Sequence, residues 1–244
     1  MEANRPRAVE EVTRRVREAI LRGDHPAGTD LPGERDLSRT MGVSRLTLRA
    51  CLARLEAEGL VRAVHGSGTR VLDYRESGGI EVMAHLVAMG AGGSAAALSI
   101  LGDLLELRRV LAVEAVGLAA SRATPDELAS LAAHLDAQAA LSGDAARWVA
   151  ADLEFARMVA RASHNAALVL VTNTLARMLE HQPGVEAAFM AAPQGTLAFY
   201  RRVLALVTAR DAERARALTR RLIERLDRQV LASLRQLLSQ EDSP

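Results

Sequence analysis

The stretch from Leu31 to Val71, LPGERDLSRTMGVSRLTLRACLARLEAEGLVRAVHGSGTRV, constrains the fold more than any other part of this sequence. Within it, Gly42-Val43-Ser44 separates two helical patterns. The Ser44 hydroxyl is placed to accept hydrogen bonds from backbone N–H groups that lack partners in the first turn of a following helix. We therefore expect one short helix from Glu34 to Met41 and a second that begins at Arg45.

The second of these helices has two distinct faces. Its apolar residues Leu48, Leu52 and Leu55 recur at three- and four-residue spacing, which predicts one buried stripe. Its arginines, among them Arg45 and Arg49, fall outside that stripe. A buried apolar stripe and an exposed arginine stripe are therefore expected on the same helix.

Glycines end this helix and shape the segment that follows. Glu58-Gly59 terminates it, and two short strand patterns, at 60–64 and 69–71, flank the turn at 65–68, which contains two glycines. Apolar spacing of three and four residues from Val9 to Leu21 predicts an earlier amphipathic helix that packs on the later pair. This order of elements predicts a winged helix-turn-helix over residues 1–73.

The remainder of the chain has a different character. Residues 74–79 lose all periodicity and gain glycine, so we expect a linker there. From 80 to 244 the patterns are helical throughout, and Thr124-Pro125-Asp126-Glu127 combines a capping residue, a proline at the first helical position and a reciprocal glutamate. Further helices are expected at 144–162, 165–181, 196–209 and 211–238. The prediction is a mostly α protein, with a small β wing and a C-terminal all-α bundle.

Composition limits the classes of protein that remain. A chain of 244 residues with 49% hydrophobic content can bury two modest cores, and its single cysteine, Cys51, excludes an internal disulfide and a thiolate metal cluster. No signal peptide or membrane span is recognised, so we expect a cytoplasmic protein with no membrane partner. The net charge is only +1, but residues 1–75 hold 14 arginines against 11 acidic residues. The excess of positive charge lies on the first domain.

The arginine-bearing helix has the chemistry of a DNA contact. In this motif the N-terminal residues of the second helix lie against base edges in the major groove. Arginine can donate two hydrogen bonds to guanine, and threonine can bond a base or touch a thymine methyl, which makes Arg45 and Thr47 candidate base contacts. Arg49 is better placed for a backbone phosphate, as is Arg35, which could also reach a base.

The turn between the strands supplies a second candidate contact. Its tip at Gly66 is narrow enough for the minor groove, with His65 as a polar probe. The alternative is that His65 is an ordinary loop residue and that the arginines form a solvated helix face. The ordered combination of helix, turn, arginine-bearing helix and glycine wing favours DNA binding.

These residues resemble the DNA-binding domain of the GntR family of bacterial transcription regulators. The resemblance rests on LPGERDLS at 31–38, GVSR at 42–45, LEAEGLV at 55–61 and the Gly-x-Gly wing. Ser44 matches a position where the family has serine or threonine, and Leu46 stands where close relatives can have threonine. The resemblance implies a homodimer on a pseudo-palindromic double-stranded DNA operator, with these contact residues: Arg35, Ser44, Arg45, Thr47 and Arg49 in the major groove, and His65 and Gly66 in the minor groove.

The helical remainder resembles the FCD-type effector domain of the FadR branch of that family, through ELRRVL at 106–111, DLEF at 152–155, ASHN at 162–165 and FYRRVLAL at 199–206. Many such domains hold a divalent metal with one aspartate and three histidines. Here Asp152 matches the aspartate, but Ala156, Tyr200 and Leu222 occupy the positions aligned with the histidines. The resemblance therefore implies no metal and no cofactor.

Because it lacks these histidines, the sequence resembles the metal-free fatty-acid regulators of the branch, whose effectors are long-chain acyl-CoA thioesters. An acyl chain requires a dry apolar cavity, and a phosphate or carboxylate requires a cation, so Arg108, Asp152 and Tyr200 are the candidate effector-binding residues. Two alternatives remain open. The effector could be a small carboxylate, with or without a metal, or Arg108 and Asp152 could simply pair inside the bundle with Tyr200 in the core.

An enzyme with an appended winged helix is a more remote alternative. Asp152 and Glu154 diverge by about 200° on a helix, so they do not form an acid and base pair. Ser163 and His164 are chain neighbours, which gives no oriented nucleophile and base. The sequence favours a ligand-responsive regulator that is not an enzyme.

Overall fold

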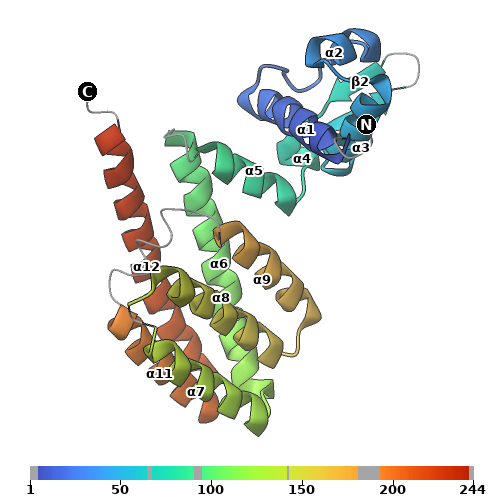
Figure 1. The fold of residues 1–244 in the computed structure, drawn as a ribbon. Coiled ribbons are helices and arrows are strands. Elements are labelled where there is room, and N and C mark those ends of the chain that lie inside the picture. The colour runs from blue at the N-terminus through green and yellow to red at the C-terminus, as the bar shows by residue number, and fades with distance from the viewer. Residues whose placement is uncertain (1–4, 65–67, 91–94, 142, 181–192, 242–244) are drawn as a thin grey trace. The chain divides into compact units, whose positions relative to one another are not determined.

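The computed structural model describes residues 5–64, 68–90, 95–141, 143–180 and 193–241. The chain divides into two compact units, Met1–Gly92 and Gly93–Pro244. Each unit is treated by itself below (Figure 1). Helices dominate both units, and the mostly α fold with one small sheet is confirmed.

Three helices and a two-stranded sheet form the body of the first unit: α1 (Arg5–Arg22), α2 (Glu34–Met41), α3 (Arg45–Ala57), β1 (Val61–Val64) and β2 (Gly68–Val71). The strands are antiparallel, with Val61 opposite Val71 and Val64 opposite Gly68. The predicted winged helix-turn-helix is therefore confirmed. Its core consists of apolar side chains from every element: Val12, Val16, Ile20, Leu31, Leu37, Leu48, Cys51, Leu52, Leu55, Leu60, Val61 and Val71.

The turn between α2 and α3 follows from two local signals. Gly42 ends α2 in the left-handed region at φ 68°, a conformation that most side chains disfavour. Ser44 then caps α3, because its hydroxyl accepts from the N–H of Thr47 at 3.1 Å. The helix boundaries at Met41 and Arg45 are those expected from the sequence.

Residues 74–90 belong to the first unit and contain two helices, α4 (Tyr74–Ser77) and α5 (Ile80–Gly90). The Ser77 hydroxyl donates to the carbonyl of Gly59 at 2.7 Å, and α5 packs against α1. Val82 on α5 is buried in the winged-helix core. The structure thus differs from the expected boundary at 74–79, because Val82 of α5 is covered by the winged helix-turn-helix, and the two units divide between Gly92 and Gly93.

The second unit is a bundle of long helices: α6 (Ala95–Arg122), α7 (Pro125–Ala139), α8 (Ala145–Ala162), α9 (Ala166–Leu179), α11 (Pro193–Thr208) and α12 (Ala212–Glu241). α6 and α12 pack along each other, and α8 contacts α6, α7 and α9. Thr124 and Glu127 form the predicted capping box at the start of α7, and Asp144 and Asn165 cap α8 and α9. None of the described helices is long and apolar enough to cross a membrane.

Candidate nucleic-acid interface and effector cavity

The exposed side of α3 begins at its first residue. Arg45, Leu46 and Arg49 are all exposed, whereas Leu48 and Leu55 are completely buried against the rest of the unit. A helix turns by about 100° per residue, so the three exposed side chains span roughly one quarter of its circumference. The structure therefore presents the N-terminal arginines of α3 to solvent, as the sequence predicted.

Thr47 lies elsewhere than the sequence led us to expect. Its side chain is only 7% exposed, and its hydroxyl is 2.9 Å from the Ser44 hydroxyl. The Thr47 side chain lies between the buried apolar stripe of α3 and the Ser44 cap, because the Ser44 and Thr47 hydroxyls contact each other in the first turn of the helix. Thr47 thus supports the cap in this structure, and it does not share the exposed face of Arg45. Ser44 caps α3 and is exposed, so its side chain is open to solvent on the face that the sequence assigned to DNA.

Two further arginines frame this surface. Arg35, in the first turn of α2, has a side chain that is 71% exposed and lies 3.6 Å from the Asp36 carboxylate. Arg49 is 67% exposed and donates to Glu34 at 2.9 Å. Exposed ion pairs of this kind contribute little stability, so either guanidinium can turn to a phosphate at small cost. His65 and Gly66, the candidate contacts of the wing, lie outside the described residues.

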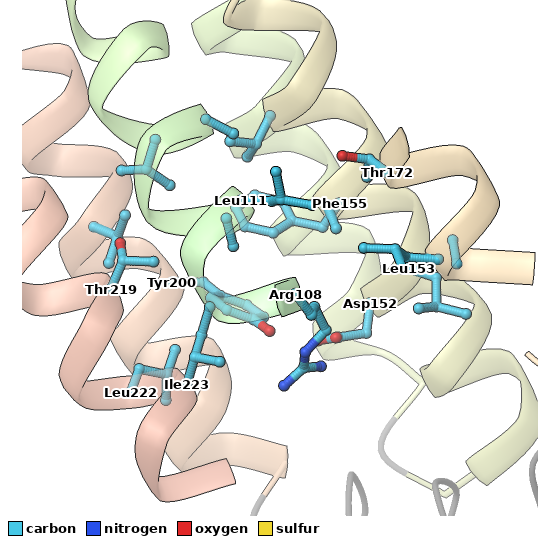
Figure 2. A pocket seen from close by; sticks show the side chains of 18 of the residues that line it. Arg108, Leu111, Asp152, Leu153, Phe155, Thr172, Tyr200, Thr219, Leu222 and Ile223 are labelled. Atoms are coloured by element: carbon cyan, nitrogen blue, oxygen red, sulfur yellow. The ribbon is translucent and has the colours of Figure 1, made fainter. Parts of the chain in front are cut away.

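A cavity of about 110 Å³ lies inside the second unit, between α6, α8, α9, α11 and α12 (Figure 2). The three predicted effector residues all line it: Arg108 from α6, Asp152 from α8 and Tyr200 from α11. Thr172 and Thr219 are polar lining residues that the sequence did not single out. The rest of the wall is apolar: Leu111, Ala112, Ala115, Val116, Leu153, Phe155, Ala156, Val159, Leu175, Ala176, Val203, Leu222, Ile223 and Leu226.

Three of the polar side chains of the cavity, those of Arg108, Asp152 and Tyr200, lie close together, whereas Thr172 and Thr219 lie apart from them. In Figure 2 the Tyr200 hydroxyl and the Arg108 guanidinium both lie toward Asp152. Burial raises the pKa of the Asp152 carboxyl from its ordinary 3.8 to about 6, although a hydrogen bond with Tyr200 and the charge of Arg108 oppose this rise. Burial and the charge of Asp152 raise the pKa of the Tyr200 phenol well above 10, so it stays protonated. The Phe155 ring packs on Tyr200 with centroids 4.8 Å apart.

One oxygen of this carboxylate is left over. Asp152 is 5% exposed, and its Oδ1 meets no hydrogen-bond partner among the residues that the structure describes. Buried carboxylate oxygens are normally satisfied, because leaving one without a donor costs on the order of 1 to 3 kcal/mol. Because Asp152 lines the cavity, a bound ligand with a hydrogen-bond donor would supply the missing partner.

Arg108 is anchored by a different acid from the one considered in the sequence. It forms an ion pair with Asp227 of α12 at 2.8 Å, and Arg109 forms a second with the same carboxylate at 3.1 Å. Asp227 is almost fully buried and was not predicted, because it lies more than one hundred residues from either arginine in the sequence. Asp227 thus holds the Arg108 side chain at the wall of the cavity, and Arg109 also lies 3.9 Å from Glu106.

The positions that hold metal in related domains come together here. Asp152, Ala156, Tyr200 and Leu222 all line the one cavity, which agrees with their alignment to a single metal site. They offer one carboxylate, a methyl group, a protonated phenol and an isobutyl group. One ligand of suitable chemistry does not hold a divalent ion, so these residues do not fit a metal centre.

The comparisons with known proteins agree with both halves of this architecture. The family described as "Bacterial regulatory proteins, gntR family" matches residues 8–71, and the FCD domain matches residues 103–225. The HTH-type transcriptional regulator Rv0494 of Mycobacterium tuberculosis is 37% identical over 181 residues, 74% of this chain and 70% of that protein.

A fatty acid metabolism regulator protein of Vibrio cholerae is 40% identical over 91 residues, which are 37% of this chain and about a third (32%) of that protein. Among solved structures, Lar, described as controlling the expression of the Listeria monocytogenes agr system, superposes with a TM-score of 0.58 at 20% identity. That superposition covers 91% of this chain and 95% of the other, and it supports the fold.

A winged helix-turn-helix followed by a helical effector domain defines a bacterial transcription regulator, and the matched relatives are regulators rather than enzymes. The chain belongs to the GntR family and carries a C-terminal FCD domain. The resemblance inferred from the sequence is thereby confirmed.

Proposed function

We propose that this regulator binds its operator as a homodimer and that a carboxylic acid or acyl thioester with an apolar tail, of the fatty acyl-CoA class, controls its occupancy. The observation that carries the proposal is the cavity in the FCD domain, whose wall is mostly apolar and whose charged and phenolic side chains, Arg108, Asp152 and Tyr200, form one cluster. An apolar tail fits the aliphatic wall, and the polar cluster fits a carbonyl or carboxylate head.

The cluster has the charges needed for such a head group. If Arg108 turns to a ligand, Asp227 keeps its ion pair with Arg109 at 3.1 Å. The buried Asp227 carboxylate is therefore not left without a positively charged partner. The Tyr200 phenol stays protonated and can donate to a carbonyl oxygen. Asp152, with a pKa of about 6, can accept a hydrogen bond from a ligand hydroxyl or amide at neutral pH or, once protonated, lie beside a carboxylate.

A second candidate effector is a small carboxylate bound without a metal. The volume of the cavity, about 110 Å³, favours it, because pockets for drug-sized ligands usually enclose roughly 300 to 1,000 Å³. A long acyl chain would need the helices around the cavity to separate. The two candidates therefore differ in whether binding must expand the bundle.

The signal would pass to DNA through the spacing of two recognition helices. Two-fold symmetry on a pseudo-palindrome makes this spacing the controlled variable, and an effector that favours one spacing by a few kcal/mol switches occupancy. Because Val82 anchors α5 in the winged-helix core, we place the movement after Gly90 and not in the segment 74–79.

The DNA half of the proposal is tested with Arg45→Ala. Binding sites are first selected from a random DNA library with the unaltered protein, and the affinity of each variant is then measured by gel retardation. We expect at least about a fivefold loss for Arg45→Ala, since one base contact by arginine is worth about 1 to 3 kcal/mol. Arg54→Ala, an exposed arginine further along α3, is the control. Equal retardation by both variants would contradict the assignment.

The effector half is tested with palmitoyl-CoA, palmitate and L-lactate as separate probes. At each concentration of a probe, we measure the unfolding temperature of the protein and the gel retardation of the selected DNA by the protein. A ligand at one hundred times its Kd stabilises the folded state by about 2.7 kcal/mol. Stabilisation by palmitoyl-CoA or palmitate supports the first candidate, and stabilisation by L-lactate alone supports the second.

A pair of alanines on α8 provides a matched control for the cavity. Ala156 lines the cavity and Ala150 does not, although both are exposed to solvent. We expect Ala156→Leu to abolish the ligand effect while Ala150→Leu retains it. A ligand effect that survives in both variants would place the effector outside this cavity.

A further inference from the structure

The recognition helix carries an exposed leucine beside its first arginine. Leu46 is 59% exposed, and no other large apolar side chain in the described part of the first unit is exposed to this degree. The remaining leucines of α3 are packed inside, with Leu48 and Leu55 at 0% exposure. Leu46 is therefore the one large apolar group that α3 presents outward.

Leu46 lies on the face that the arginines define. At 100° per residue, Leu46 is about 60° from Arg49 around the helix axis, and Arg45 is about 40° from Arg49 on its other side. The two exposed guanidinium groups suit the phosphates and guanine edges of a DNA groove. Whatever surface these arginines approach is thus also the surface that meets the leucine.

Only one group in the major groove matches an aliphatic side chain. The base edges there present hydrogen-bond donors and acceptors, except for the C5-methyl of thymine. A leucine held against any other edge would cover a polar group without replacing its hydrogen bond to water, which costs free energy. Against thymine it would remove two apolar surfaces from water together.

Thr47 does not provide this contact in the structure. It is buried, and its hydroxyl lies at 2.9 Å from the Ser44 hydroxyl in the cap. The first turn of α3 therefore offers solvent an arginine and a leucine, and no exposed threonine. A donor such as Arg45 and a neighbouring apolar group would recognise two adjacent base pairs by different chemistry.

We propose that Leu46 is a specificity-determining residue that recognises the methyl group of a thymine next to the base contacted by Arg45. The inference rests on DNA binding by α3 and goes beyond it, because it assigns a base preference to one residue. Removal of the thymine methyl should lower the affinity about fourfold, the effect of one buried methyl-sized group.

The experiment has two parts: selection of preferred binding sites, and removal of single thymine methyl groups from the best site. Sites are selected from a random duplex library with the unaltered full-length protein, with Leu46→Ala and with Leu170→Ala. Leu170 is an exposed leucine of α9 and serves as the control. Each thymine of the best site is then replaced by deoxyuridine, which removes only the methyl group.

We expect a thymine preference that is present for the unaltered protein and Leu170→Ala, and absent for Leu46→Ala. Uracil at that one position should weaken the unaltered protein about fourfold and leave Leu46→Ala unchanged. If all three proteins select the same bases, or if uracil weakens the binding of Leu46→Ala as much as that of the unaltered protein, the proposed role of Leu46 is wrong. DNA recognition by α3 is not contradicted by either result. If the unaltered protein enriches no sequence, DNA recognition by α3 fails, and this inference fails with it.

Discussion

Replacing Asp152 with asparagine tests whether the cavity holds a carboxylate at a cost to stability. The carboxyl is 5% exposed, and burial raises its pKa to about 6 from an ordinary value of 3.8. An acid whose pKa is raised in the folded state contributes fully to stability below pH 3.8, and this contribution is lost as the pH rises through 6. The difference between the two values corresponds to about 3 kcal/mol.

Asparagine has nearly the same shape and does not ionise in this range. The free energy of unfolding of Asp152→Asn, minus that of the unaltered protein, should therefore be smallest near pH 4. It should rise by about 2.4 kcal/mol between pH 4 and pH 8, with most of the change between pH 4 and pH 6. The substitution is thus expected to stabilise the protein at neutral pH.

Urea unfolding followed by tryptophan fluorescence is a suitable assay, because Trp148 is the single tryptophan and is fully buried on α8, one turn before Asp152. Asp103→Asn, which replaces an exposed aspartate on α6, is the control. A difference that does not vary with pH, or an Asp152→Asn protein that is less stable at pH 8, would refute this account. A carboxylate retained at such a cost is expected of a ligand site rather than of a packing position.

Three further outcomes are expected. Ser44→Ala should lower the free energy of unfolding by about 1 kcal/mol through loss of the α3 cap, measured by urea unfolding; no change would show that the cap contributes nothing. Arg49→Ala should weaken binding to all DNA sequences alike and reduce the slope of log affinity against log salt by about 1, whereas a sequence-dependent loss would assign it to a base. The triple substitution Ala156→His, Tyr200→His and Leu222→His should bind one zinc per chain with Asp152, measured by elemental analysis; absence of zinc would show that the four positions do not converge as the cavity suggests.

The local part of the fold was predictable because its signals are local. Gly42 and Ser44 define a helix end and a helix start through the conformation of one residue and one hydroxyl, and neither depends on distant contacts. The capping box at Thr124 and Glu127 is another such case. The linker prediction at 74–79 differed from the structure. The glycines and polar residues there indicate a linker, but they do not show that Val82, just after them, is buried in the winged-helix core and so keeps this segment in the first unit.

The sequence by itself determined the winged helix-turn-helix, the helical second domain and the three polar side chains, Arg108, Asp152 and Tyr200, that belong to one site. Tertiary structure alone decided what those residues face. It brought apolar residues from five helices around them, paired Arg108 with Asp227 at 2.8 Å and left an oxygen of Asp152 without a donor among the described residues. These properties arise from packing between helices far apart in the chain.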